Sequence, residues 1–421
     1  MTTPQDDRPP QQQGHPFSRR ALLFGAGGGL AVGAAAGVGG SAAVGAVQSA
    51  SGESIDLARS YPFYDQAHQA GIQTEPQRYI VYMTFDMVSD TRQDLQVLLA
   101  RWSGAIAQLM QGRTIGAVQP ERHDAVAVDT GEALDLAPAG LTVTVGLGPG
   151  IFDRRFGLSG KKPSRLADLP DLPSDQLDPA LTGGDLSLQA CADDPQVAYH
   201  AIRDLARMAQ PTAATRWTVL GFGRASAGPG QKTPRNLMGF KDGTRNIRED
   251  AEYDRFVWVD DDAAWTRGGS YQVVRKIRMN IENWDADAIG DQQHVFGRRK
   301  AEGEPLTGHG EFDTPDFHAT HGGASVIPNT AHIALAAHEN NGGVKILRRG
   351  YNYTDGLNQY GLLDAGLLFI AYMNDPAHFV RLQTRLGRAD LLNEYIAHIG
   401  SAAFFVPPAP KRGGYLGEKL F

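Results

Sequence analysis

The chain has 421 residues, of which 42% are hydrophobic and 21% are charged, an ordinary globular composition. This length supports two or three domains with a large core, and the single cysteine, Cys191, excludes a framework of internal disulfides. The formal net charge is −7 and no Lys/Arg-rich block occurs, which argues against nucleic acid or an anionic membrane as the main partner.

Residues 1–50 resemble a twin-arginine export signal. The Arg19-Arg20 pair precedes a long Gly- and Ala-rich stretch without charge, and small residues at Ala46 and Ala50 suit a signal peptidase. An uncleaved membrane anchor is the alternative, although Gly and Ala carry little apolar surface for a membrane span. The resemblance implies export by the twin-arginine machinery to the periplasm, the cell envelope or the outside of the cell. Such proteins are exported folded and commonly carry a cofactor.

After this signal, strand-like and helix-like patterns alternate. Runs of β-branched and apolar residues predict strands, and apolar residues at helical spacing predict helices. The predicted strands are 78–85, 141–147, 186–191 and 217–222, and the predicted helices are 92–109 and about 195–208. The Gly- and Pro-rich stretch 223–234 then breaks the pattern and is interpreted as a connection between domains. We therefore expect an N-terminal domain at 55–225 and a C-terminal domain at 226–421.

The C-terminal domain continues these patterns around one long polar loop that runs to about residue 329. The predicted strands are 271–279, 346–353 and 367–373, and the predicted helices are about 285–299, 376–386 and 391–399. This mixture predicts an α+β fold with antiparallel sheet.

Two segments of the chain resemble each other. Residues 189–199 and 370–380 each read as a strand that ends in Asp-Pro, with a helix opening at the proline. A carboxylate N-cap followed by proline begins a helix well in any fold, which is the simpler explanation. A true duplication predicts two similar α+β halves packed together.

Three motifs carry the most specific signal. They are Gly-Phe-Lys-Asp-Gly-Thr at 239–244, Ala-His-Ile-Ala-Leu-Ala at 331–336 and Ile-Leu-Arg-Arg-Gly-Tyr at 346–351. Each alone is weak, since Asp-Gly is a common turn and a histidine in an apolar run is more often a core residue. Together they resemble the dye-decolourising haem peroxidases, and most closely the exported deferrochelatase/peroxidase branch. The resemblance spans about residues 55–410.

The resemblance implies two ferredoxin-like halves with antiparallel sheets and haem b bound in the C-terminal half. It assigns the proximal iron ligand to His332, the distal aspartate to Asp242 and the distal arginine to Arg348. A neutral imidazole can hold haem iron and leave the opposite coordination site for peroxide. A carboxylate can relay the peroxide proton, and a guanidinium can stabilise developing charge or pair with a haem propionate. Arg349 is the alternative to Arg348, because adjacent residues on a strand point to opposite faces.

The second ring N–H of a proximal histidine usually has an acceptor. The candidate acceptors are Asp364, Asp375 and Asp390. Asp375 matches a helix cap in the duplicated segment, so Asp390 is expected to hold His332. Gly243 and Thr244 are expected to let the backbone approach the haem edge, where a side chain larger than that of glycine would collide.

Three functions of different classes remain open. The leading one is an exported haem b peroxidase that reduces hydrogen peroxide and oxidises dyes, phenols or similar small aromatic donors. The second is a haem-handling deferrochelatase, or a ferrous-iron-oxidising partner of an iron-uptake system. The third is a metal-binding module without redox turnover, built on the polar-loop residues His309, His318 and His321 with Glu311 and Asp313.

Overall fold

The computed structural model describes residues 55–223, 233–260 and 263–421. The expected signal at 1–50 and most of the expected domain connection at 223–234 lie outside the described residues. Among the helices in the described ranges, none is both long enough and apolar enough to cross a membrane.

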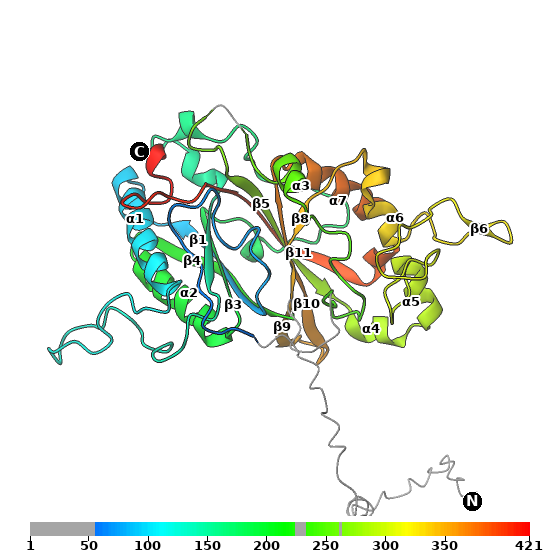
Figure 1. The fold of residues 1–421 in the computed structure, drawn as a ribbon, viewed down its shortest axis with the longest axis horizontal. Helices are drawn as coiled ribbons and strands as arrows, with labels where there is room; N and C mark the ends of the chain where they lie inside the picture. The colour runs from blue at the N-terminus through cyan, green and yellow to red at the C-terminus, as the bar shows by residue number, and fades with distance from the viewer. Residues whose placement is uncertain (1–54, 224–232, 261–262) are drawn as a thin grey trace, which may run out of the picture. The chain divides into compact units, whose positions relative to one another are not determined.

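The first half of the described chain runs β-α-β-β-α-β and forms an antiparallel sheet (Figure 1). Its elements are β1 (Tyr79–Met87), α1 (Arg92–Leu109), β2 (Thr142–Leu147), β3 (Leu186–Ala192), α2 (Pro195–Ala209) and β4 (Ala213–Phe222). The strands pair in the order β2-β3-β1-β4. This connectivity and strand order are those of a ferredoxin-like fold.

Side-chain caps begin both helices of this half. The Thr91 side chain accepts a hydrogen bond from Asp94 N at the start of α1, and Asp194 accepts two from Gln196 N and Val197 N at the start of α2. Pro195 takes the first helical position of α2, where its missing N–H costs nothing. The predicted helix starts are therefore confirmed.

The second half repeats this arrangement, but a different segment connects its first and second main strands. Its four main strands and its long helix are β5 (Ser270–Met279), β9 (Tyr351–Leu357), β10 (Leu363–Met373), α7 (Ala377–Ala389) and β11 (Ile396–Val406). The strands pair antiparallel in the order β11-β5-β10-β9, which matches the order of the first half. The predicted α+β fold with two ferredoxin-like halves is confirmed.

Short elements replace the long first helix in this second half. Between β5 and β9 lie α4 (Ile281–Ala286), α5 (Ile289–Phe296), β6 (Thr320–His321), β7 (Ala324–Ser325), α6 (His332–Ala336) and β8 (Leu347–Arg348). A further helix, α3 (Asp250–Phe256), precedes β5. Helix α6 lies beside α7, as α1 lies beside α2 in the first half.

The sheets of the two halves join at both edges. Strand β11 pairs with β2 at Phe405 and Leu147, and β4 pairs with β9 through Gly221 and Phe222. Because β5 also pairs with β10, the strands β5-β11-β2-β3-β1-β4-β9-β10 close into a ring. Figure 1 shows α1 and α2 on one side of these strands and α3, α6 and α7 on the other. The helices therefore cover the sheets from outside.

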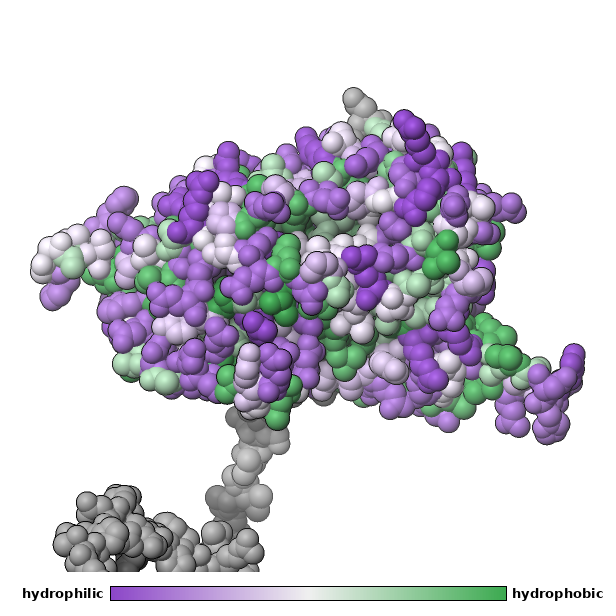
Figure 2. All heavy atoms as spheres, turned by 180° about the vertical axis from the view of Figure 1, so that it is seen from behind, coloured by the Kyte–Doolittle hydropathy of each residue, from purple (hydrophilic) through white to green (hydrophobic). Residues whose placement is uncertain are grey.

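Buried side chains connect the two halves within the core. The Tyr82 hydroxyl donates to Gln272 Oε1 at 2.8 Å, and Gln272 Nε2 donates to the Tyr372 hydroxyl oxygen at 2.7 Å. Tyr372 in turn donates to Gln189 Oε1 at 2.8 Å. On the outer face drawn in Figure 2, apolar side chains appear only as small patches among hydrophilic ones. Most large apolar side chains of the described residues lie in the core.

The predicted helix at 391–399 is wrong. Only Leu391–Glu394 forms a short 3-10 turn, capped by Asp390, which accepts a hydrogen bond from Leu392 N. From Ile396 onward the backbone is β11, which pairs with β5 as far as Val406. Both faces of β11 are largely buried, so its sequence lacks the polar/apolar alternation that indicates a strand.

Two other predicted elements are divided. The predicted helix at about 285–299 is two short helices, α4 and α5, which are separated at Asp287 and Ala288. The predicted strand at 346–353 is interrupted at Arg349 and Gly350, so that β8 and β9 are separate elements. The second interruption lies beside Arg348, one of the predicted site residues.

Candidate active site

One cavity of about 250 Å³ lies in the second half and contains most of the residues that the motifs predict. Its walls come from β5, β10 and β11, from α5, α6 and α7, and from the segment that holds the first motif. Its apolar lining is Met238, Ile277, Met279, Phe296, Ile333, Ala336, Ala337, Val344, Ile346, Leu367, Phe369, Phe379, Leu382, Leu386, Leu392 and Ile396. Asp242, Gly243, Thr244, His332, Arg348 and Asp390 line the same cavity.

His332 is the first residue of α6 and is held by a buried carboxylate. Its Nδ1 donates a hydrogen bond to Asp390 Oδ2 at 2.6 Å. The other oxygen of Asp390 accepts from Leu392 N at 2.9 Å, so the carboxylate itself is fixed. The ring of Phe296 meets the imidazole edge to face with 6.0 Å between centroids. A histidine that donates through Nδ1 in its neutral form carries its lone pair on Nε2, the atom available to a metal.

Burial and neighbouring charges shift the pKa of His332 in opposite directions. Burial lowers its pKa, but the charge and hydrogen bond of Asp390 raise it by more, so that the pKa lies above the usual value. Arg348 lowers the same pKa and Asp242 raises it, because both charged groups line the same cavity as the imidazole. Asp390 therefore makes His332 a more electron-rich ligand than a free imidazole.

Two further histidines line the cavity, but their surroundings differ. His398 lies on β11 and is buried, with its Nε2 accepting a hydrogen bond from Gln383 Nε2 at 3.1 Å. Burial and the charge of Arg275 lower the pKa of His398 to about 3. His338 Nδ1 lies 3.2 Å from Glu339, whose side chain is 38% exposed. Of the three, His332 has the carboxylate partner that is itself buried.

Asp242 and Arg348 form an ion pair in the same cavity. Arg348 donates a guanidinium N–H to Asp242 Oδ1 at 2.7 Å. Its backbone is held by β8, where it pairs with Ala371 of β10. Asn246 clamps the same backbone from the other side, accepting from Arg348 N at 2.8 Å and donating to Arg348 O at 2.7 Å. The guanidinium therefore extends from a fixed base.

Arg349, the alternative to Arg348, points elsewhere. Its side chain is buried and donates to Thr74 O and, at 2.6 Å, to Gln77 Oε1, both in the first half. Arg349 does not line the cavity. Adjacent residues on an extended backbone face opposite ways, and the structure directs Arg348 to the cavity.

The loop that carries Asp242 has its own internal scaffold. The Asn236 side chain accepts hydrogen bonds from Met238 N and Phe240 N, both at 3.2 Å, and closes the turn that precedes the aspartate. Asp242 N donates to Pro234 O at 2.8 Å. Gly243 has a φ of +124°, a conformation that residues with a Cβ rarely adopt. The local sequence thus fixes where the Asp242 carboxylate lies.

Glu311 was not predicted for this site, yet it ties the polar loop to the motif. It accepts hydrogen bonds from Lys241 Nζ at 2.6 Å, from Thr244 Oγ1 at 2.9 Å and from the Thr233 hydroxyl. Burial raises its pKa, but these donors lower it by more, so that the pKa lies below its usual value. The sequence offers no spacing that relates Glu311 to a motif about 70 residues earlier.

The cavity is rich in positive charge. Its basic side chains are Lys241, Arg245, Arg275, Arg298, Lys345 and Arg348. Five of them form ion pairs with carboxylates, and the pairs are Lys241–Glu311, Arg245–Glu339, Arg275–Asp175, Lys345–Glu252 and Arg348–Asp242. Arg298 instead donates to the backbone carbonyls of Gly303 at 2.6 Å and Glu311 at 2.9 Å. Burial, and then the charge of Arg245, lowers the Arg298 pKa to about 10. Arg298, for which the described residues offer no ion pair, and the apolar walls together suit an anionic ligand with a large apolar body.

The remaining candidates lie outside this arrangement. Asp375 lies two residues before the first residue of α7 and accepts a hydrogen bond from Ala377 N at 2.9 Å, and Asp364 lies on β10 outside the cavity lining. His309, His318 and His321 are exposed. In the described ranges, these three histidines do not belong to any group with metal-ligand spacing.

Comparisons with known proteins agree with this geometry. The family model "Dyp-type peroxidase, N-terminal" matches residues 69–223, and "Dyp-type peroxidase, C-terminal" matches residues 233–411. A protein named deferrochelatase from Yersinia pseudotuberculosis is 37% identical over 425 residues, covering 96% of this chain and 94% of its own length.

The chain is also similar to solved structures of Dyp-type peroxidases. Ferric DtpA from Streptomyces lividans superposes with a TM-score of 0.80 at 39% identity, covering 86% of this chain and 97% of that one. A DyP-type peroxidase from Streptomyces coelicolor has a TM-score of 0.80 at 39% identity, covering 86% of this chain and 98% of that one.

Proposed function

The chain belongs to the Dyp-type peroxidase family, and from that premise we propose that His332, Asp242 and Arg348 form the active site of a haem b peroxidase. The enzyme reduces hydrogen peroxide at the expense of an electron donor. The single observation that carries the assignment is the hydrogen bond from His332 Nδ1 to buried Asp390, in the cavity that also holds the Asp242–Arg348 pair.

The residues of the cavity fit a haem. The apolar walls suit the porphyrin body, and the imidazole of His332 suits the iron. Haem propionates are anionic, and Arg298 and Arg348 are the cavity cations that we assign to them. Gly243, with its positive φ, and Thr244 bring backbone to the cavity wall where a bulkier residue would intrude.

The roles of the residues come from their chemistry. Haem, when bound, supplies the iron that binds peroxide and exchanges electrons with it and with the donor. Peroxide must lose a proton from one oxygen and gain one at the other, and the Asp242 carboxylate accepts and returns that proton. Arg348 holds Asp242 through its 2.7 Å hydrogen bond and stabilises negative charge that develops on the peroxide oxygens. In total, peroxide takes two electrons and two protons and leaves as two waters.

The donor and the cellular location belong to the proposal as well. We assign small aromatic donors, such as phenols and dyes, to the enzyme. The twin-arginine pattern in residues 1–50 supports export of the folded protein to the periplasm, cell envelope or exterior. The haem-binding domain is assigned to 226–421 and the N-terminal domain to 55–225.

A second candidate function is deferrochelatase activity. The name of the Yersinia pseudotuberculosis relative favours it, and the same cavity would then hold haem as substrate, in concert with an iron-uptake system.

One experiment separates the two functions. Haem-loaded protein is given hydrogen peroxide with a phenolic donor in one reaction, and excess haem without peroxide in another. Oxidised donor in the first reaction supports peroxidase function, whereas fluorescent metal-free porphyrin in the second supports iron release. A protein that oxidises no donor in the presence of peroxide would contradict the peroxidase assignment.

A further inference from the structure

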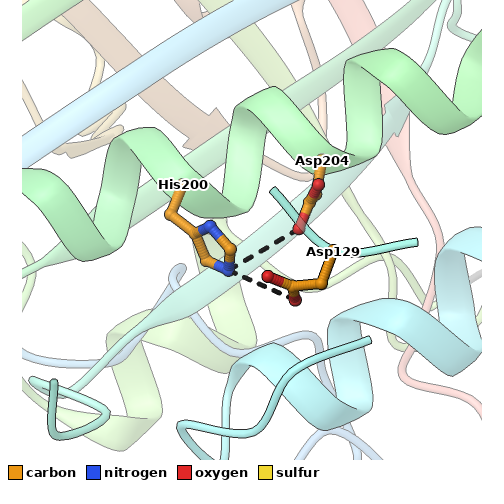
Figure 3. Close-up of side chains that lie close together, drawn as sticks. All are labelled: Asp129, His200 and Asp204. Carbon is orange, nitrogen blue, oxygen red and sulfur yellow. Dashed lines mark ion pairs between the residues drawn. The ribbon is translucent and has the colours of Figure 1, made fainter. Parts of the chain in front are cut away.

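A second group of titratable side chains lies in the first half of the molecule and takes no part in the cavity. His200 and Asp204 are four residues apart on α2 and therefore share one face of that helix. Asp129 approaches them from the connection between α1 and β2 (Figure 3). All three residues are buried, and the side chains of Asp129 and Asp204 are fully so. One ligand atom from each lies within 4.8 Å of the other two.

The hydrogen bonds of His200 define which ring nitrogen faces the two aspartates. Nδ1 lies 3.2 Å from Glu132 Oε2, so the ring donates to that carboxylate through Nδ1. Nε2 lies 3.6 Å from both Asp129 Oδ2 and Asp204 Oδ2, which is too long for a hydrogen bond. Metal binding requires the neutral ring with its proton on Nδ1, in which the Nε2 lone pair faces these two carboxylate oxygens. Three electron-donating atoms thus converge on one buried point.

Both aspartates are held in place from outside this point. Asp129 accepts from Gly131 N at 2.8 Å and from Ile115 N at 2.9 Å, and Asp204 Oδ1 accepts from Thr130 N at 3.2 Å. Asp204 Oδ2, by contrast, has no hydrogen-bond partner, although the side chain is fully buried. A buried carboxylate oxygen without a partner is costly. Figure 3 shows that this carboxylate is directed at His200.

We propose that Asp129, His200 and Asp204 bind a divalent transition-metal ion, through one carboxylate oxygen of each aspartate and through His200 Nε2. Ligand atoms at about 2.0–2.2 Å from one ion are separated by about 3.3–3.6 Å in a tetrahedral site, which matches the 3.6 Å from His200 Nε2 to each carboxylate oxygen. A set of one imidazole and two carboxylates suits Zn²⁺, Mn²⁺ or Fe²⁺ better than Ca²⁺, which prefers oxygen alone. Glu132 accepts the other N–H of the ligating histidine, as an outer carboxylate does in many metal sites.

The position of the ion gives it a structural role. Asp129 and Glu132 belong to the connection that leads from Leu109 to Thr142, which contains turns but neither helix nor strand in the described chain. His200 and Asp204 belong to α2, which packs on the sheet. An ion at this point therefore fastens the connection to the helix and leaves peroxide chemistry to the other half.

The test is a metal titration of tag-free, haem-loaded protein that has been dialysed against a chelator. Isothermal titration with ZnCl₂ is expected to show one strong site, and Zn²⁺ is expected to raise the unfolding temperature. His200→Gln and Asp204→Asn are each expected to weaken Zn²⁺ affinity at least tenfold. His318→Gln, which changes an exposed histidine, is the matched control and is expected to bind Zn²⁺ as the wild type does.

A spectroscopic measurement on the wild type keeps the test independent of how well the variants fold. The extended X-ray absorption fine structure above the zinc edge of the loaded protein is expected to show one imidazole nitrogen with oxygen ligands at about 2.0–2.2 Å. Absence of stoichiometric binding by the wild type would overturn the proposal. Equal affinity in wild type and His200→Gln, or an absorption spectrum without imidazole, would overturn it too.

Discussion

The two halves of the molecule share a strand order but differ in the segment that connects their first and second strands. In the first half, the 18-residue helix α1 packs beside α2 and fills the outer face of the sheet with Leu95, Leu99 and Trp102. In the second half, short helices and a polar loop take that place, and the cavity lies between the sheet and α7. The cavity therefore lies where the packed helix of the first half is replaced by a connection that leaves space.

The same contrast applies to the histidines. His332 opens α6 with its Nε2 available in the cavity, whereas His200 sits on α2 among carboxylates. Each ring donates its Nδ1 proton to a carboxylate, Asp390 or Glu132. The two imidazoles thus share this contact, and we propose haem iron as the ligand of His332 and a divalent metal ion as the ligand of His200.

The greatest loss of activity is expected from changes confined to the second half. Asp242→Ala and Arg348→Ala each remove a group that acts on peroxide, so kcat/KM for peroxide is expected to fall about 10²–10⁴-fold. Steady-state kinetics of donor oxidation measure this loss, and the Soret absorbance checks that haem remains bound. Unchanged rates in either variant would contradict the assigned role of that residue.

A change confined to the first half is expected to affect stability instead. Trp102 is fully buried in α1, and its Nε1 donates to Leu205 O of α2 at 2.8 Å. Trp102→Ala is expected to lower the free energy of unfolding by about 3–5 kcal/mol, because it leaves a cavity and removes the hydrogen bond to Leu205 O. Denaturant unfolding measures the loss. Peroxidase activity per folded molecule is expected to stay at the wild-type value, and a large drop in that activity would show that the halves are not separable.

A smaller effect is expected at the carboxylate that holds His332. Asp390→Asn keeps the shape of the side chain but removes the charge that makes the imidazole electron-rich. Loss of such a partner is expected to reduce haem affinity or activity about 10–100-fold. The iron–histidine stretching band in the resonance Raman spectrum is expected to move to lower frequency, a change that a purely structural role would not produce. An unmoved band would argue against the role of Asp390.

The smallest effect concerns Glu311. Its pKa is lowered in the folded chain, so its ionised form stabilises the fold above the unfolded pKa of about 4.3, and this contribution is lost as pH falls through the lower folded value. Glu311→Gln is expected to cost about 1–3 kcal/mol of unfolding free energy at pH 7. The difference from wild type should shrink below pH 4. A difference that does not change with pH would mean that the charge of Glu311 contributes nothing.

Much of this fold could be predicted from the sequence, because in most elements the local pattern of apolar and capping residues agrees with the helix or strand that forms. Asp194-Pro195 marks a helix start, and β1 to β4 appear as apolar runs of strand length. Strand β11 was missed because both of its faces are buried, which removes the alternation. The pattern at 346–353 could not show that the backbone breaks after Arg348.

The candidate active site also contains residues that could be predicted from the sequence and residues that could not. The motif residues Asp242, His332 and Arg348 could be selected from the chain because the resemblance named them, and the structure brings them to one cavity. Glu311 could not be selected, because its partners lie about 70 residues earlier and its own surroundings look like a solvated loop. The separate group Asp129, His200 and Asp204 in the first half was missed as well, because only the spacing of His200 and Asp204 on one helix is local.

The assignment of His332 to haem iron in the second half can be tested by one spectroscopic comparison. Absorption spectra are recorded for haem-reconstituted wild type, His332→Ala and His338→Ala, before and after a stoichiometric addition of hydrogen peroxide. His338 lines the same cavity, so its variant controls for the loss of an imidazole there. We expect an intense Soret band that shifts with peroxide in wild type and His338→Ala, and a weak or altered band in His332→Ala. A His332→Ala spectrum identical to that of wild type, or a wild type that stays colourless with haem, would contradict the assignment.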